Sequence, residues 1–152
     1  MNPPEIKQQQ DNLIRFSKLY TQQDLDMVLL QNKDITYVGI QFKNHPLYAK
    51  CREDLKAALK EFQLACAYLS QCKRSKSINK NNSLSYWQKH RLEKFIGTYI
   101  ANGSIIAAAT CLGIKYVADK SNPMNVWLAI SKDLPVTDDM IQLAMSMRRK
   151  ED

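Results

Sequence analysis

The stretch TYIANGSIIAAATCLGI, residues 98–114, combines a run of small and aliphatic side chains with one glycine before it and another after it. Ser104 can cap a short helix that ends at Leu112, and Gly113 stands where a left-handed residue favours helix termination. Two interpretations fit such a helix. It is either the scaffold helix of a DNA-reading helix-turn-helix or a helix buried in a core.

A helix-turn-helix needs a small residue at the fifth position of its first helix, a glycine at the turn, and two apolar docking positions on its second helix. Counting from Ile105, Ala109 and Gly113 satisfy the first two requirements. The docking positions are Asp119 and Asn122, so no recognition helix is predicted. We therefore predict a core helix, whose three consecutive alanines allow a neighbouring helix to approach closely.

The segments before this stretch are predicted to be helical. Apolar residues recur every three or four positions over 48–69, after Pro46, and again over 85–100. This periodicity predicts a long central helix and a second helix, which forms a helix-turn-helix-like pair with the small-residue helix. The polar residues 73–83 between them predict a loop.

The segments after it are predicted to form a hairpin and a last helix. Residues 116–130 alternate about Asn122-Pro123, which favours a β-hairpin in the C-terminal half. Residues 137–150 begin with Thr137 as a cap, are acidic in the first turn and are basic in the last, which favours a terminal helix.

The N-terminal third is less regular. Residues 1–12 are polar, with two prolines and a glutamine run, and predict a disordered leader. Thr21 is a predicted helix cap, with Asp24 in the following acidic turn, and the β-branched residues 35–42 predict a strand or extended segment. The predicted fold is therefore α+β and mostly helical, with one globular domain over 13–152.

Composition narrows the class of protein. The chain has 152 residues, 45% hydrophobic and 24% charged, as in ordinary globular proteins. The longest apolar run is too short to cross a bilayer, and the first residues lack the pattern of a secretory signal, so we expect a cytoplasmic protein without membrane contact. The cysteines match no metal-binding pattern and are predicted to be reduced and mostly buried: Cys51, Cys66, Cys72 and Cys111.

Catalytic patterns are weak. The two histidines, His45 and His90, do not predict a nucleophilic site, and Cys51 falls on an apolar helix face. Adjacent carboxylates lie mainly in predicted first turns, where the helix dipole favours them. With four glycines and no phosphate-binding loop, we expect no enzyme, no cofactor and no metal.

Positive charge is concentrated between Lys73 and Lys94, where seven of the cations face a single acid, while the whole chain has a net charge of +7. On the helix over 85–100, Trp87 is predicted to share a face with cations. Cations neutralise phosphates and an aromatic ring can stack on an unpaired base. The candidate nucleic-acid-binding residues are Lys73, Arg74, Lys76, Lys80, Trp87, Lys89, His90, Arg91 and Lys94.

Two alternatives remain open. The cations can form a solvated face while Trp87 packs beneath the hairpin or on the long helix. The protein can also be an adaptor or inhibitor that docks a protein partner, or a second copy of itself, through the hairpin around Trp127 or the methionines of the last helix, Met140, Met145 and Met147. Lower sensitivity to salt distinguishes such an apolar interface from phosphate binding.

The central stretch also resembles a group of small uncharacterised bacterial proteins of plasmids, prophages and integrative elements. The similar pattern is an aromatic-Ile-x-Asn-Gly-x-x-Ile-Ala-Ala-Ala-x-x-Leu-Gly segment, here Tyr99 to Gly113, followed by Asn122-Pro123. The resemblance implies a bacterial mobile-element origin and no catalytic residue. Our sequence-based hypothesis is a small non-enzymatic nucleic-acid-binding accessory protein.

Overall fold

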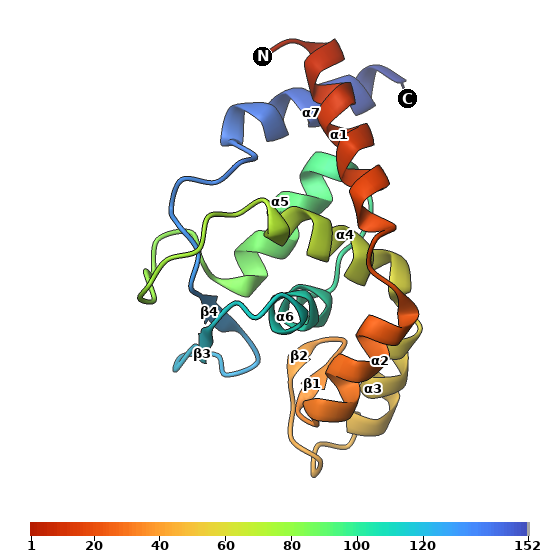
Figure 1. Ribbon diagram of the computed structural model, residues 1–152, viewed down its shortest axis with the longest axis vertical. Coiled ribbons are helices and arrows are strands. Elements are labelled where there is room, and N and C mark those ends of the chain that lie inside the picture. The colour runs from red at the N-terminus through yellow and green to blue at the C-terminus, as the bar shows by residue number, and fades with distance from the viewer. Residues whose placement is uncertain (152) are drawn as a thin grey trace.

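The computed structural model describes residues 1–151 and shows one mostly helical α+β domain, as predicted. Figure 1 shows α6 in the middle of the molecule, with α7 and the start of α1 at one end and two small antiparallel hairpins. The helices are α1 (Pro3–Ser17), α2 (Gln22–Gln31), α3 (Tyr48–Lys56), α4 (Leu59–Ser70), α5 (Ser85–Ile96), α6 (Asn102–Cys111) and α7 (Asp138–Glu151). The hairpins pair β1 (Ile35–Thr36) with β2 (Gly39–Ile40) and β3 (Tyr116–Ala118) with β4 (Val126–Leu128).

Helix α6 is the centre of the core. Every residue from Asn102 to Ala109 is buried, and α4, α2, α5 and the β1–β2 hairpin all pack against it. In Figure 1 this helix is seen end-on in the middle of the molecule. Gly113 ends it with a left-handed φ of 71°, and the chain continues into β3. The core-helix prediction is therefore confirmed, and no recognition helix follows.

The Asn-Gly pair at the start of α6 is a docking point for both hairpins. The Gly103 amide donates to the carbonyl of Tyr37 at 3.0 Å, and a Cβ at Gly103 would lie 1.7 Å from the Thr36 carbonyl oxygen. The Asn102 amide donates to the carbonyl of Val38 at 3.2 Å and to Asn125 Oδ1 at 3.0 Å. Only glycine allows this close approach of strand backbone and helix.

The predicted long central helix is two helices. It breaks at Ala57 and Ala58, where Ala58 adopts φ −100° and ψ 47°. The break lets α3 pack on α2 and β1 while α4 packs on α1 and α6. Because neither residue is a helix breaker, helical periodicity continues through the break, and tertiary packing decides it.

The predicted disordered leader is wrong, because residues 3–17 form helix α1. The Asn2 side chain caps the helix by accepting from the Glu5 amide at 3.0 Å, and proline is favourable in the first turn. Ile6 and Leu13 are buried in the core, and α1 packs on α4 and α7. Gln10 also donates to the Phe95 carbonyl at 2.8 Å, so both apolar and polar contacts hold this segment.

Several local predictions are confirmed. Thr21 and Asp24 form a reciprocal capping box at α2, and Thr137 Oγ1 accepts from the Met140 amide at 3.3 Å at the start of α7. The β3–β4 hairpin is present, whereas residues 35–42 form a tight hairpin instead of one strand. No helix within residues 1–151 is long and apolar enough to span a membrane.

Candidate nucleic-acid interface

The predicted basic loop is attached at both ends to one extended segment, residues 126–131, which includes β4. At the start of the loop, the backbone at Lys73 and Ser75 forms hydrogen bonds of 2.7 and 3.0 Å with this segment. At its end, the Ser83 carbonyl accepts from the same segment at 2.9 Å. The loop and the β3–β4 hairpin therefore form one unit.

A buried chain of hydrogen bonds fixes the last corner of the loop. The Tyr68 hydroxyl donates to Gln88 Oε1 at 2.6 Å, and the Gln88 amide donates to the carbonyl of Asn82. Asn82 has a left-handed φ of 62°, a conformation that asparagine tolerates better than most residues. Burial raises the pKa of Tyr68, so its phenol stays a proton donor. The loop corner is thus held from inside the core.

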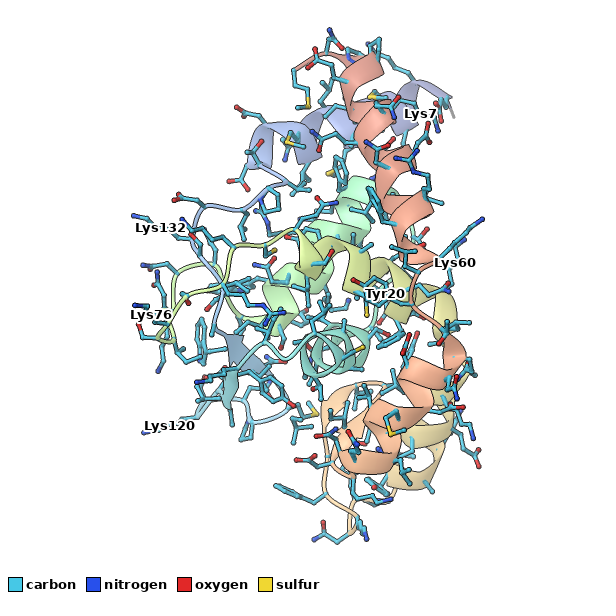
Figure 2. The ribbon with its side chains drawn as sticks, viewed as in Figure 1. Lys7, Tyr20, Lys60, Lys76, Lys120 and Lys132 are labelled. Carbon is cyan, nitrogen blue, oxygen red and sulfur yellow. The ribbon has the colours of Figure 1, made fainter. Side chains whose placement is uncertain are left out.

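Exposed cations lie on the surface of three joined segments, namely the loop, the β3–β4 hairpin and the residues that follow β4. We call this surface the basic face, and its exposed members are Lys73, Arg74, Lys76, Lys80, Lys115, Lys120 and Lys132. Figure 2 shows Lys76, Lys120 and Lys132 along one edge of the molecule, with Lys7 and Lys60 on the other side. Asp119 and Asp133 are the acids on the same segments, and Asp119 accepts from Ser121 at 2.9 Å. The balance of charge on this face is strongly positive.

Both tryptophans of the chain lie beside the basic face. Trp87 and Trp127 pack edge to face, with ring centroids 5.7 Å apart and an interplanar angle of 86°. Lys80 Nζ lies 5.7 Å from the centre of the Trp127 ring. Trp127 is half-buried, whereas Trp87 is 44% exposed. The exposed Trp87 predicted on α5 is therefore found, and it also packs against the hairpin.

Lys89 does not belong to the surface. Its side chain is buried and its ammonium lies 2.7 Å from Glu93 Oε1. It also lies 4.6 Å from the centre of the Tyr99 ring and 5.8 Å from that of Tyr86. The placement of Lys89 among exposed cations is wrong, because a long amphipathic side chain on the inner edge of α5 can fold back onto an internal acid.

Arg91 has a structural role, because its guanidinium is bound within the protein. Its guanidinium donates to Asp138 Oδ1 and to the Val136 carbonyl, which ties α5 to the start of α7. Burial acts to lower the pKa of Arg91, but the hydrogen bond to Asp138 and the nearby Tyr68 outweigh it and raise the pKa above its ordinary value. Arg91 is a fixed cation whose charge is matched within the protein.

The other two polar residues predicted on α5 differ from each other. His90 is partly exposed, with Nδ1 3.2 Å from Glu93 Oε2 and its ring edge-on to Tyr86. Lys94 is exposed, and its backbone carbonyl accepts from Arg148. Lys94 therefore keeps a free side chain on the α5 face that carries Trp87.

A cavity of about 460 Å³ lies between α5 and α7 at this face. Helix α5 contributes four residues at helical spacing and α7 contributes three, while Asn82 closes one end. Its lining is Asn82, Trp87, His90, Arg91, Lys94, Asp138, Ile141 and Gln142. This cavity brings four of the predicted site residues together.

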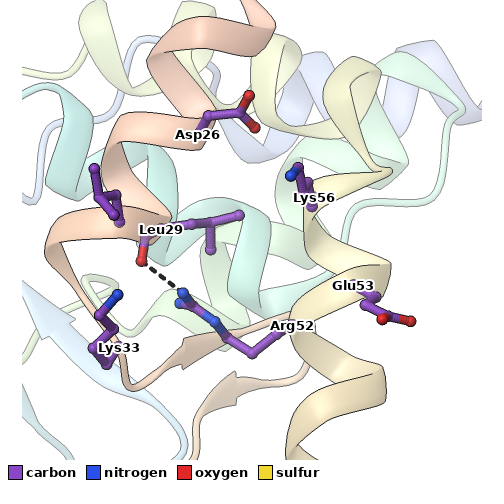
Figure 3. Close-up of a pocket in the computed structure, with 7 residues that line it drawn as sticks. Asp26, Leu29, Lys33, Arg52, Glu53 and Lys56 are labelled. Carbon is purple, nitrogen blue, oxygen red and sulfur yellow. Dashed lines mark hydrogen bonds between the residues drawn. The ribbon is translucent and has the colours of Figure 1, made fainter.

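A second cavity, between α2 and α3, has a structural explanation. Figure 3 shows Arg52 pointing from α3 to the end of α2, where its guanidinium donates to the Leu29 carbonyl at 2.6 Å. It also donates to the carbonyls of Asn32 at 2.8 Å and Ile35 at 3.0 Å. The carbonyls of Leu29 and Asn32 are left free at the C-terminus of α2, so Arg52 acts as its cap, and the bond to Ile35 ties it to β1 as well. The charged lining is mixed in sign, with Asp26, Lys33, Glu53 and Lys56.

The four cysteines are free thiols, as predicted, and Cys51, Cys66 and Cys72 are buried. Burial raises the pKa of Cys66, and it raises that of Cys72 to about 12. Buried neutral thiols of this kind are inert. Within residues 1–151 no three His, Cys, Asp or Glu side chains gather to hold a metal ion.

Sequence reasoning missed Lys115, Lys120 and Lys132, and it assigned Trp127 to a protein-docking surface and not to this region. The hairpin that carries the first two and Trp127 was predicted. What was not predicted is the pairing of the loop with β4, which joins residues more than forty positions apart. Neighbouring positions in the chain give no signal for such a contact.

Comparison with known proteins finds no family model, curated protein or solved structure that matches this chain.

Proposed function

We propose that this protein is a non-enzymatic accessory protein that binds nucleic acid through the basic face. The observation that carries the proposal is that three segments joined by backbone hydrogen bonds together carry seven exposed cations. Lysine and arginine side chains neutralise backbone phosphates and release the counterions condensed on them, which drives association without sequence readout. A bacterial mobile element as the source rests on the resemblance of residues 99–113 alone.

Order in the loop supports the proposal. Long basic side chains lose conformational entropy on binding, and a loop that is already fixed adds little backbone cost to this. Here, hydrogen bonds to residues 126–131 and to Gln88 hold both ends of the loop. The backbone positions that carry its cations are therefore fixed relative to the hairpin.

Fluorescence anisotropy tests the proposal. A labelled oligonucleotide of about 16 nucleotides, single-stranded or duplex, is titrated with protein at about 50 and 200 mM salt. We expect binding at low salt and an affinity that falls about 100- to 1,000-fold at the higher salt, because several phosphate contacts are lost together. No binding of either form at low salt would refute the proposal.

A protein-binding adaptor is the second candidate. The surface that best supports it lies beside the β3–β4 turn and not on the last helix. Met140 is buried, and Met145 and Met147 pack against the core, so the last helix offers little of its methionine surface. Exposed apolar side chains surround a cavity of about 410 Å³ beside the β3–β4 turn, where Phe42 is 69% exposed and Met124 is 40% exposed. Exposed apolar side chains beside a cavity are a feature of interaction sites, which supports this candidate. Partner binding that tolerates 200 mM salt and is lost in Phe42→Ser would favour this function.

A further inference from the structure

We infer that the cavity between α5 and α7 receives the base of an unpaired nucleotide, so that the protein prefers single-stranded to duplex nucleic acid. This inference rests on the proposed function, because the phosphates on either side of that base would lie on the basic face. It assigns the cavity a ligand class, a flat heteroaromatic ring with polar edges.

The walls of the cavity suit such a ring. Trp87 supplies an exposed aromatic surface on α5, and Ile141 supplies an apolar contact on α7. The primary amides of Asn82 and Gln142 can each donate and accept at a base edge. Stacking on tryptophan tolerates every base, so no sequence preference is required.

The two tryptophans have separate roles. Trp127 is half-buried, with Lys80 over its ring, and it supports Trp87 edge to face at 5.7 Å. Trp87 is 44% exposed and lines the cavity. Of the pair, Trp87 is therefore the ring that meets the base.

The cavity is formed before any ligand arrives. The Tyr68–Gln88–Asn82 chain holds the loop corner, and Arg91 is held by Asp138 and the Val136 carbonyl. A preformed site loses less entropy on binding than one that must be assembled. Bases in a duplex stay stacked in the helix and cannot enter a side cavity of this kind without being extruded.

The cavity is connected to the basic face through a neighbouring cavity that Lys132 lines. An adjoining cavity of about 350 Å³ shares Asn82, Arg91 and Asp138 with it and is lined by Lys132. Lys94 is exposed at the α5 wall. Asp133 and Asp138 are the acids at this rim, and the Asp138 carboxylate is engaged by Arg91. A backbone that leaves the base cavity therefore has Lys94 and Lys132 available for its phosphates.

Trp87→Ala tests the inference against a single-stranded oligonucleotide and a duplex of equal length. We expect affinity for the single strand to fall about 5- to 150-fold, as for loss of one stacked base, and affinity for the duplex to change less than about twofold. Trp87→Phe should retain much of the single-strand affinity. Phe16→Ala is the matched control, since Phe16 is also 44% exposed but lies on α1.

Tryptophan emission gives a second readout that leaves Trp87 in place and keeps an aromatic ring at position 127. Trp87 and Trp127 are the two tryptophans of the chain, so Trp127→Phe leaves Trp87 as the single emitter. We expect an unlabelled single strand to quench this emission, because a stacked base contacts the ring, and a duplex to leave it nearly unchanged.

The outcomes separate the inference from the proposed function. Equal salt-sensitive affinity for both forms, together with no effect of Trp87→Ala and no quenching, would overturn the base cavity and leave the basic face supported. No binding of either form by the wild-type protein would overturn both.

Discussion

Lys89 and Trp87 are two residues apart on α5 and have opposite environments. Trp87 is 44% exposed and meets the hairpin, while Lys89 is buried with its ammonium 2.7 Å from Glu93. Both were predicted on one surface because Lys89 belongs to the cluster of cations between Lys73 and Lys94 in the sequence. The difference comes from Glu93 and Tyr99, which give the Lys89 ammonium internal partners.

Lys89→Met should reduce stability. It leaves Glu93 without its closest cation, although Glu93 still accepts from the Ile100 amide at 3.1 Å and is partly exposed. We expect the free energy of unfolding in urea to fall by about 2–4 kcal/mol. Lys76→Met, at an exposed lysine, should change it by less than about 0.5 kcal/mol. A fully stable Lys89→Met protein that no longer binds oligonucleotide would place Lys89 in the interface.

Gly103 is the residue on which the docking of the β1–β2 hairpin depends. In Gly103→Ala the new Cβ would lie 1.7 Å from the Thr36 carbonyl oxygen, so the strand backbone must move away from α6. We expect thermal and urea unfolding to show a loss of about 2–3 kcal/mol or more. Wild-type stability in this variant would show that the hairpin does not pack so closely on α6.

At the scale of elements, predictions that depend on residues close together in the sequence are confirmed, and those that depend on tertiary contacts are not. The capping box at Thr21, the turn at Gly113 and the β3–β4 hairpin depend on residues close together in the sequence, and these predictions are confirmed. The break at Ala58 depends on packing against two different helices, so helical periodicity could not reveal it. The order in α1 likewise depends on distant partners for Ile6 and Leu13.

Helix α1 should contribute substantially to stability. Ile6 is fully buried and Ile14, on the same helix, is 42% exposed. We expect Ile6→Ala to lower the free energy of unfolding by about 2–4 kcal/mol, because it leaves a cavity in the core. Ile14→Ala should cost less than about 1 kcal/mol. Equal, small effects of the two substitutions in denaturant unfolding would mean that α1 is not packed on the core.

At the scale of the whole molecule, the distribution of charge carries the functional account. The loop cations and Trp87 could be identified from composition and helical spacing, and Lys80 of the loop lies over Trp127, which packs on Trp87. The cations of the hairpin and Lys132 join them only through the pairing of the loop with residues 126–131. Sequence neighbours therefore identified only the loop part of the surface. They also assigned Lys89 and Arg91 to it, although these two side chains pair with acids within the protein.

The most direct test of the basic face compares two charge reversals of equal size. Lys76→Glu/Lys132→Glu changes the basic face, and Lys7→Glu/Lys60→Glu changes lysines elsewhere on the molecule, as Figure 2 shows. Both variants have the same net charge. We expect the first to lose about tenfold or more in oligonucleotide affinity at low salt, with a shallower salt dependence by about one to two phosphate contacts, and the second to stay close to wild type. Equal losses in the two variants would mean that net charge alone drives binding, and would contradict a localised interface.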